Sequence, residues 1–230
     1  MADAPHPSVL LAGGGTAGHV NPLLAVADEL ARDRAGTRAA AAAQLGLDAD
    51  RPTLLVSGGS LGAVSVNTAV AGAAADLLAA GVQVLHLTGA GKADAVRAAL
   101  EGVPGAEGYH VREYLTEMHL ALAVADVVVG RSGAGTVCEQ AALGIPAVYV
   151  PLPVGNGEQR LNAAAVVAAG GGLLVDDADL DPAWIRAHLP VLLVGETATE
   201  TRERMSAAAA SVGVRDAAAR VARLVEAELP

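Results

Sequence analysis

Short apolar segments alternate with longer helical segments along almost the whole of this 230-residue chain. The apolar segments have the length of strands: Val9–Ala12, Thr53–Ser57, Val82–Thr88, Tyr109–Arg112, Asp126–Gly130, Ala147–Val150 and Gly172–Val175. Strands that are apolar throughout are typical of parallel sheets, because helices cover both faces of such a sheet. The alternation therefore predicts an α/β fold with a doubly wound parallel sheet.

Helical segments fill most of the chain between these strands and beyond the last one. They are Leu23–Arg34, Arg38–Leu45, Ala63–Ala80, Lys92–Leu100, Glu117–Ala125, Gly133–Leu143, Glu158–Ala169, Pro182–His188, Glu196–Ala210 and Val214–Glu228. Glycines that suit a left-handed helix end follow several of them, at Gly46, Gly81, Gly102, Gly144 and Gly170. Residues 37–230 are expected to form one complete Rossmann-like domain. Residues 1–36 are expected to be the remnant of a second one, with linkers at Arg34–Thr37 and Asp48–Pro52.

The composition and charge of the chain exclude several classes of protein. The formal net charge is −10 and aromatic residues make up 2% of the chain, so no nucleic acid is expected as a partner. The single cysteine, Cys138, excludes an internal disulfide and suits a reducing compartment. The sequence shows neither a signal peptide nor an apolar run of membrane-spanning length. A soluble, cytoplasmic protein is therefore expected.

The first glycine-rich junction is Gly13–Gly18, which satisfies G-x-G-x-x-G between a predicted strand and a predicted helix. Its backbone amides suit a phosphate, although a tight turn would also need small residues. A dinucleotide site requires an acidic residue about twenty positions on, at the end of a second strand. No strand precedes the segment Arg32–Arg38. An NAD(P)-binding Rossmann protein is thus an alternative that rests on the glycines alone.

Two further glycine-rich junctions also lie between a predicted strand and a predicted helix. In Ser57–Ala63, Ser60 either caps a helix starting near Leu61 or faces an anion. In Gly130–Glu139, Thr136 offers a hydroxyl at the helix start. Glu139 suits the two hydroxyls of a ribose, or is an ordinary first-turn glutamate favoured by the helix dipole.

A fourth segment, Val150–Ala163, leads from a strand end through prolines and glycines into a helix. Glu158 and Gln159 at the start of that helix could bind sugar hydroxyls, or could belong to a capped, solvated helix start. The carboxyl ends of parallel strands share one edge of the sheet, where ligands bind. Phosphate, ribose and polyhydroxyl sites at one edge predict a nucleotide-sugar as ligand.

In this order, GGGTAGHVNP, SGGSLGA, RSGAGTVCE and GNGEQRLNA resemble the MurG family of bacterial transferases. The resemblance covers Val9–Arg34 and then Arg38 to the end. It implies a GT-B fold, in which two Rossmann-like domains face each other across a cleft and the C-terminal one holds most of the donor. It also implies transfer of N-acetylglucosamine (GlcNAc) from UDP-GlcNAc to lipid I, which forms lipid II in peptidoglycan synthesis. The displacement would proceed with inversion and without a metal or cofactor.

The resemblance also assigns site residues. It implies that Thr16, Ala17 and Gly18 lie beside the sugar phosphate, that Ser60 contacts the phosphates, and that the backbone of Leu115 contacts the uracil. The residues along the UDP would be Ala134, Gly135, Thr136, Val137, Cys138 and Glu139, with Glu139 on the ribose. Gln159 and Glu158 would bind the GlcNAc ring. His19 would lie nearest the chemistry, although a structural role fits it equally well. Cys138 is expected to pack as a small apolar residue.

The family's N-terminal domain is a full Rossmann-like unit, whereas here it stops after one strand and one helix. Donor binding is therefore predicted ahead of turnover. An alternative is a donor-binding subunit that needs a separate acceptor-binding partner. Val9–Arg34 cannot bury a core alone, so it is expected to pack on the main domain or on a second copy of the chain. Contact with the membrane surface is expected to be peripheral.

Overall fold

The computed structural model describes residues 34–217 together with residues 220 and 223. Six parallel strands form one sheet in the order β3-β2-β1-β4-β5-β6. Their bounds are β1 Thr53–Ser57, β2 Gln83–Leu87, β3 Tyr109–Arg112, β4 Val127–Gly130, β5 Ala147–Tyr149 and β6 Gly172–Leu174. The predicted doubly wound α/β fold is confirmed. The predicted strand Val9–Ala12, its docking site and the helix Leu23–Arg34 lie outside the described residues, apart from Arg34.

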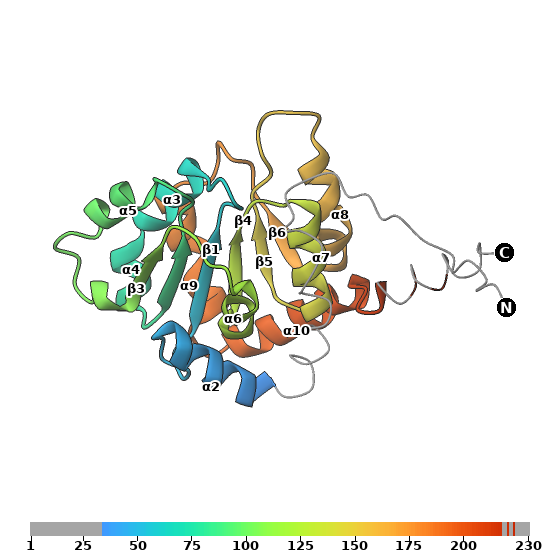
Figure 1. Ribbon diagram of the computed structural model, residues 1–230, viewed down its shortest axis with the longest axis horizontal. Helices are drawn as coiled ribbons and strands as arrows, with labels where there is room; N and C mark the ends of the chain where they lie inside the picture. Colours follow the sequence, from blue (N-terminus) through green and yellow to red (C-terminus); the bar gives the residue numbers. More distant parts are fainter. Residues whose placement is uncertain (1–33, 218–219, 221–222, 224–230) are drawn as a thin grey trace, which may run out of the picture.

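Helices cover both faces of the sheet (Figure 1). One face packs against α2 (Arg34–Leu45), α6 (Met118–Val124), α7 (Ala134–Leu143) and α8 (Glu158–Ala169). The other packs against α3 (Val64–Ala71), α4 (Ala74–Ala79), α5 (Ala93–Ala99) and α9 (Pro182–Leu193). The remaining elements are the 3₁₀ turn η2 (Ala106–Gly108) and α10 (Ala198–Val212), which contacts α7, α8 and α9.

Burial on both faces explains why the strands are apolar throughout. Along β1, Leu54 and Val56 belong to the hydrophobic cluster on one face, and Leu55 belongs to the cluster on the other. All three side chains are completely buried. Each strand residue therefore contributes to one of two cores, which is the physical basis of the sequence pattern.

Three expectations about helix bounds were wrong. The single helix predicted over Ala63–Ala80 is two helices, interrupted at Gly72, where a Cβ atom would lie 2.6 Å from Cγ of Pro182. The helix predicted over Pro182–His188 continues through Pro190 to Leu193, which buries Leu192 and Leu193 in the core. The predicted linker Arg34–Thr37 is instead the first turn of α2.

The loop Asp48–Pro52, predicted to be a linker, is fastened to the domain. Arg38 Nε donates to the Ala49 carbonyl (2.9 Å), and Arg38 Nη2 donates to the Arg51 carbonyl (2.9 Å). The same guanidinium forms an ion pair with Asp126 (2.9 Å). These contacts hold α2 and its loop against the amino ends of the central strands. Among the described residues, no helix is long and apolar enough to cross a membrane.

Candidate functional site

The strand order places a topological switch point between β1 and β4, since connections leave these neighbouring strands in opposite directions. Ser57 and Gly130 face each other at the carboxyl ends of the two strands. A Cβ atom on Gly130 would lie only 2.0 Å from the Ser57 carbonyl oxygen, so the close approach requires glycine. Ligands of open α/β sheets bind in the crevice at such a point. The predicted SGGSLGA and RSGAGTVCE segments therefore begin side by side.

The loop after β1 does not form the helix cap expected at Ser60. The chain makes a further turn at Gly59 and Gly62, both with positive φ (80° and 69°), before α3 begins at Val64. The capping residue is Ala63, without a side-chain cap, and Ser60 is exposed. The capping alternative for Ser60 is wrong. Its role toward an anion stays a prediction.

Helix α7 starts at the switch point, and no side chain caps it at Gly133. The N-cap residue therefore supplies no acceptor to the first backbone N–H groups of α7, as at an anion-binding helix start. Glu139 is the sixth residue of α7 and half-buried, so it is not the first-turn glutamate of the alternative interpretation. Its carboxylate reaches back toward the helix start, since a Cβ atom on Gly135 would lie 3.9 Å from Oε1.

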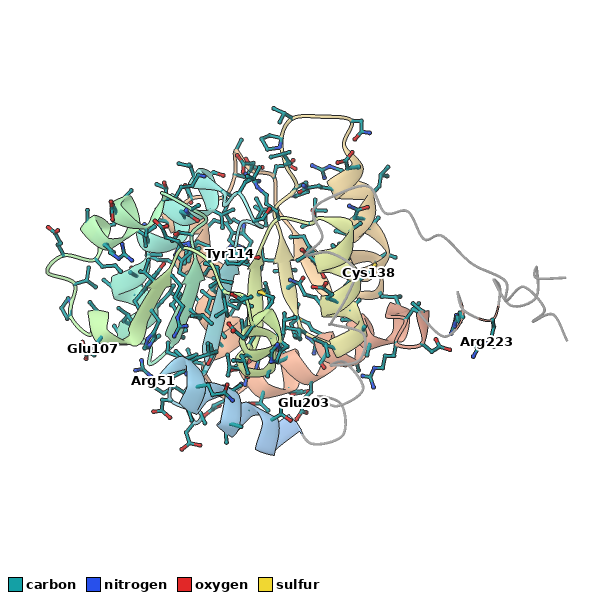
Figure 2. The ribbon with its side chains drawn as sticks, viewed as in Figure 1. Arg51, Glu107, Tyr114, Cys138, Glu203 and Arg223 are labelled. Carbon is teal, nitrogen blue, oxygen red and sulfur yellow. The ribbon has the colours of Figure 1, made fainter. Side chains whose placement is uncertain are left out.

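Cys138 is exposed, so the expectation that it packs as a small apolar residue was wrong. It lies on α7, between Val137, which is buried, and the half-buried Glu139 (Figure 2). Helical geometry turns each residue by about 100° from the one before, which puts Cys138 on a different face of α7 from Val137. Ala134, Gly135 and Thr136 form the first turn of the same helix.

The loop after β5 places Gln159 where it was predicted, at the start of α8. Its Oε1 accepts a hydrogen bond from the Leu152 N–H (3.0 Å). This bond orients the amide and leaves its nitrogen to donate elsewhere. Glu158, the first residue of α8, is exposed, and its own N–H donates to Asn156 Oδ1 (3.2 Å).

Leu115 lies in the loop between β3 and α6, and its half-buried side chain packs against the core. The neighbouring loop after β2 crosses the loop after β1, because a Cβ atom on Gly62 would lie 2.0 Å from the Thr88 carbonyl oxygen. Lys92 Nζ donates to the Leu61 carbonyl (2.6 Å) and so ties the same two loops together. The sequence had assigned no role to Lys92.

Arg131 lies at this edge and has several polar contacts, although the sequence analysis assigned it no role. It follows β4 directly, and its Nη1 lies 2.5 Å from Asp177 Oδ1. Nη1 also donates to the carbonyls of Val150 (3.2 Å) and Pro151 (3.1 Å), and Nη2 donates to Ser65 Oγ (3.1 Å). The only sequence signal was a charged residue between an apolar strand and a glycine-rich turn.

A buried polar network lies under these loops. Asn67 Nδ2 donates to the Thr88 carbonyl (2.9 Å), which leaves its Oδ1 to accept from His86 Nε2 (3.0 Å). His86 Nδ1 then accepts from the Tyr109 hydroxyl (2.7 Å). Burial lowers the pKa of His86 to about 3, so the imidazole is neutral in the folded protein.

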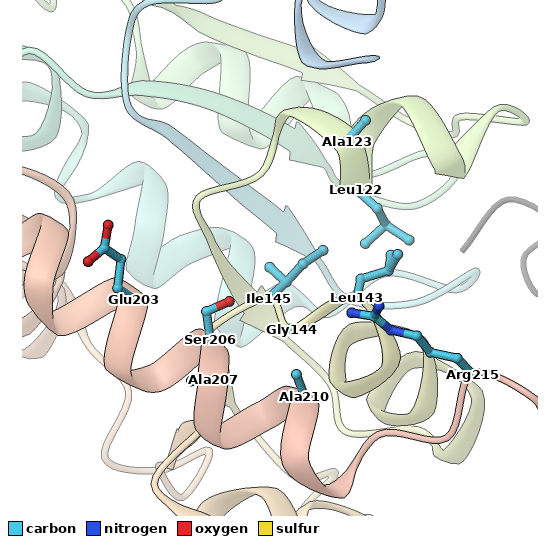
Figure 3. Close-up of a pocket in the computed structure, with 10 residues that line it drawn as sticks. All are labelled: Leu122, Ala123, Leu143, Gly144, Ile145, Glu203, Ser206, Ala207, Ala210 and Arg215. Carbon is cyan, nitrogen blue, oxygen red and sulfur yellow. The ribbon is translucent and has the colours of Figure 1, made fainter. Parts of the chain in front are cut away.

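Two cavities lined by described residues lie at the opposite edge of the sheet, where the strands begin. One, of about 340 Å³, is lined by α10 on one side and by the ends of α6 and α7 on the other, including Leu122, Leu143 and Arg215 (Figure 3). The second, of about 380 Å³, adjoins Arg38 and Asp126. Both lie at the amino ends of strands, away from the switch point.

The structure thus brings together most of the residues predicted from the motifs. Ser60, Glu139 and Gln159 follow strands β1, β4 and β5, and the carboxyl ends of parallel strands share one edge. Thr16, Ala17, Gly18 and His19 lie outside the described residues. Among the described residues, no group of three or more His, Cys, Asp or Glu side chains could hold a metal ion.

Residues 53–221 match the family described as the glycosyltransferase family 28 C-terminal domain. A relative from Bifidobacterium adolescentis, named UDP-N-acetylglucosamine–N-acetylmuramyl-(pentapeptide) pyrophosphoryl-undecaprenol N-acetylglucosamine transferase, is 52% identical over 213 residues, covering 87% of this chain and 53% of the relative. A relative of the same name from Leifsonia xyli is 54% identical over 205 residues, covering 89% of this chain and 54% of the relative. The chain therefore spans about half the length of the curated relatives it matches.

Solved structures agree on the fold. The crystal structure of MurG from Acinetobacter baumannii superposes with a TM-score of 0.68 at 24% identity, covering 96% of this chain and 58% of that one. The calicheamicin glycosyltransferase CalG4 superposes with a TM-score of 0.56 at 27% identity, covering 77% of this chain and 43% of that one. In both cases the described domain corresponds to about half of a larger protein.

Proposed function

Because this chain belongs to the family of glycosyltransferase family 28 C-terminal domains, we propose that it binds the UDP-GlcNAc donor of a lipid II-forming transferase. The acceptor of that reaction is lipid I, a lipid-linked muramoyl-pentapeptide, which agrees with the names of the relatives. A lipid-linked acceptor would bring the chain to the cytoplasmic face of the membrane as a peripheral protein. The family match favours a nucleotide-sugar over the nicotinamide alternative.

One observation carries the proposal. Three glycine-rich or proline-rich loops leave the carboxyl ends of β1, β4 and β5 at a single edge, and two helices with glycine N-caps, α7 and α8, begin there. Helix starts of this kind stabilise phosphate oxygens through backbone N–H groups and the helix dipole. Loops with polar side chains beside them offer partners for ribose and hexose hydroxyls. This combination suits a diphosphate that carries a sugar on each side.

The assigned roles follow from these positions. The first-turn amides of α7 would bind the pyrophosphate, with Ser60 beside it, and Glu139 would accept hydrogen bonds from the ribose hydroxyls. The oriented Gln159 amide, with Glu158 next to it, would bind hydroxyls of the GlcNAc ring. The backbone at Leu115 would contact the uracil. Thr16, Ala17 and Gly18 retain their predicted role beside the sugar phosphate, and His19 retains its predicted place nearest the chemistry.

The transfer would proceed by direct displacement. The C4 hydroxyl of the acceptor attacks the anomeric carbon as UDP leaves, which inverts the configuration. A base must accept the hydroxyl proton, and negative charge builds on the leaving UDP. The residues of this chain suited to the second task are the backbone amides at the start of α7, because fixed dipoles stabilise developing charge without reorganisation.

A second arrangement, in which another polypeptide supplies the acceptor-binding half, is favoured by exposed apolar side chains at this edge. Leu61, Tyr114 and Val154 are exposed large apolar side chains on loops at the same edge, where a second domain would cover them. The test is to assay transfer with and without the amino-terminal half of the Bifidobacterium relative, added as a separate polypeptide. Turnover that depends on the added half supports this arrangement, and turnover without it contradicts it.

Donor binding is tested by calorimetric titration of the purified chain with UDP-GlcNAc, UDP-glucose and NAD in parallel. The proposal predicts the tightest binding for UDP-GlcNAc, weaker binding for UDP-glucose, which lacks the acetamido group, and none for NAD. Absence of heat with both UDP-sugars would contradict the proposed function. Binding of NAD ahead of the UDP-sugars would favour the nicotinamide alternative.

A further inference from the structure

The Arg131 side chain lies at a junction of four segments that are distant in sequence. Its guanidinium contacts Asp177 after β6, Ser65 at the start of α3, and the carbonyls of Val150 and Pro151 after β5. Arg131 itself follows β4. The four segments belong to β1, β4, β5 and β6, which are neighbours in the sheet. One side chain therefore connects the carboxyl ends of four adjacent strands.

The partners of Arg131 also contact one another. Ser65 Oγ donates to Asp177 Oδ1 (2.6 Å), the same oxygen that faces Arg131 Nη1. The Arg131 and Asp177 side chains are only 12% and 18% exposed, so the pair is largely shielded from water. Hydrogen bonds between ionised partners in such surroundings are shorter and stronger than neutral ones. The cluster can therefore hold the loops in a single arrangement.

Each contact leads to a residue of the proposed donor site. The backbone at Arg131 continues within three residues into the first turn of α7, and the Pro151 carbonyl immediately precedes Leu152, whose N–H orients Gln159. Asn162 on α8 adds a link between these two loops, since its Nδ2 donates to the Ser132 carbonyl (3.0 Å). Ser65 lies next to the first residue of α3, which ends the loop carrying Ser60.

We propose that Arg131, paired with Asp177, is a positioning residue that sets the mutual arrangement of the α7 start, the Gln159 loop and the Ser60 loop. The inference rests on the proposed function, because the loops it holds are those of the proposed donor site. Arg131 acts through Asp177, Ser65 and two carbonyls, without direct contact with the ligand. A planar guanidinium can donate to all of these acceptors together, whereas an ammonium group cannot.

The chain contains a matched control at the opposite edge of the sheet. Arg38 and Asp126 form an ion pair with similar side-chain exposure, 21% and 20%, and Arg38 likewise donates to backbone carbonyls. Thr53 N–H donates to Asp126 Oδ2 (2.8 Å), so its hydrogen exchange rate measures whether that pair is intact. The exchange rate of Leu152 N–H measures in the same way whether the Gln159 loop is held in place. Loss of either arginine removes an ion pair and several hydrogen bonds to backbone carbonyls, but only Arg131 borders the proposed site.

The experiment compares the variants Arg131→Lys and Arg38→Lys by amide hydrogen exchange in the absence of ligand and by calorimetric titration with UDP-GlcNAc. We expect Arg131→Lys to accelerate exchange at Leu152 at least tenfold without affecting Thr53, and to raise the Kd at least tenfold. Arg38→Lys should accelerate exchange at Thr53 and leave the Kd unchanged. Asp177→Asn, which keeps the size of the side chain, should repeat the Arg131→Lys pattern and serves as the second variant if Arg131→Lys does not fold.

The outcomes are separable. Equal acceleration at Leu152 and Thr53 in Arg131→Lys would mean a general loss of stability and would overturn the inference. A wild-type Kd in Arg131→Lys would overturn it as well. If the unaltered chain does not bind UDP-GlcNAc, the proposed function fails, while the crossed exchange pattern still decides whether Arg131 positions these loops.

Discussion

An arginine–aspartate pair lies at each of two edges of the sheet, but the two pairs connect different kinds of segment. At the amino edge, where the strands begin, Arg38 and Asp126 hold α2 and the loop Asp48–Pro52 against the strands. At the carboxyl edge, Arg131 and Asp177 connect the segments that follow β4, β5 and β6. In each case an arginine satisfies carbonyls that no strand or helix partner reaches. The difference lies in the segments that the arginine connects.

The segments at the carboxyl edge expose large apolar side chains such as Leu61, and two helices, α7 and α8, begin there at glycine N-caps. The arrangement at the amino edge is closed, since the Gln83 amide and Arg38 occupy most of the acceptors of its loop. Two cavities lie at the amino edge, whereas the proposed nucleotide-sugar site lies at the carboxyl edge.

The largest expected effect is that of Gly62→Ala. The substitution puts a Cβ atom at 2.0 Å from the Thr88 carbonyl oxygen in a backbone with φ of 69°, so the loops after β1 and β2 must separate. We expect a loss of about 3 kcal/mol in the free energy of unfolding, measured by urea titration. Gly46→Ala is the matched control, since Gly46 has a similar φ of 72° but no neighbour within 4 Å. That variant should lose about 1 kcal/mol. Equal losses of unfolding free energy in the two variants would show that the loops after β1 and β2 are not closely packed at Gly62.

Arg38→Met tests the amino edge. The substitution leaves Asp126 without its ion-pair partner and the carbonyls of Ala49, Arg51 and Val124 without their donor. We expect a loss of about 2 kcal/mol in the free energy of unfolding, a reduced value because the pair is partly exposed to water. Arg97→Met, which removes an exposed pair with Asp94, should cost less than about 0.5 kcal/mol. A change in the UDP-GlcNAc Kd of Arg38→Met would contradict the functional difference between the edges.

Glu139→Ala tests whether UDP-GlcNAc binds at the carboxyl edge. Loss of a carboxylate that accepts from the ribose should raise the UDP-GlcNAc Kd about thirtyfold, or about 2 kcal/mol, measured by calorimetry. Glu203→Ala, in the cavity at the amino edge, serves as the control and should leave the Kd unchanged. An unchanged Kd in Glu139→Ala would remove Glu139 from the ribose site. A larger effect of Glu203→Ala would move the site to the other edge.

The smallest effect concerns pH and the network under the carboxyl edge. Burial lowers the pKa of His86 to about 3, below its value of 6.5 in an unfolded chain. Between these values the unfolded chain binds the additional proton, so stability falls as pH falls. From about pH 7 to about pH 5.5, His86 should account for about 1 kcal/mol of lost stability. His86→Gln should remove this part of the pH dependence in urea unfolding measured at both pH values. Equal slopes for the two proteins would contradict it.

Much of the fold could be predicted because its signals are local. The predicted ranges of β1, β3 and α8 match the structure, and the glycines expected after helices, such as Gly144 and Gly170, have positive φ. One error arose from a contact between distant residues, since Gly72 interrupts the predicted helix where Pro182 packs against it. Another was local, since a turn at Gly59 and Gly62 moves the start of α3 away from Ser60. The contact with Pro182 has no signature in the sequence around Gly72.

The amino-acid sequence by itself determined the alternation of strands and helices and the order of the glycine-rich segments. Hydrophobic periodicity and backbone freedom at glycine are properties of a few consecutive residues. Only the tertiary structure decided which strands are neighbours at the shared edge, that Cys138 is exposed, and that Arg131 contacts Ser65, a residue 66 positions away. Such contacts depend on strand order and on the packing of remote segments, which no local pattern contains.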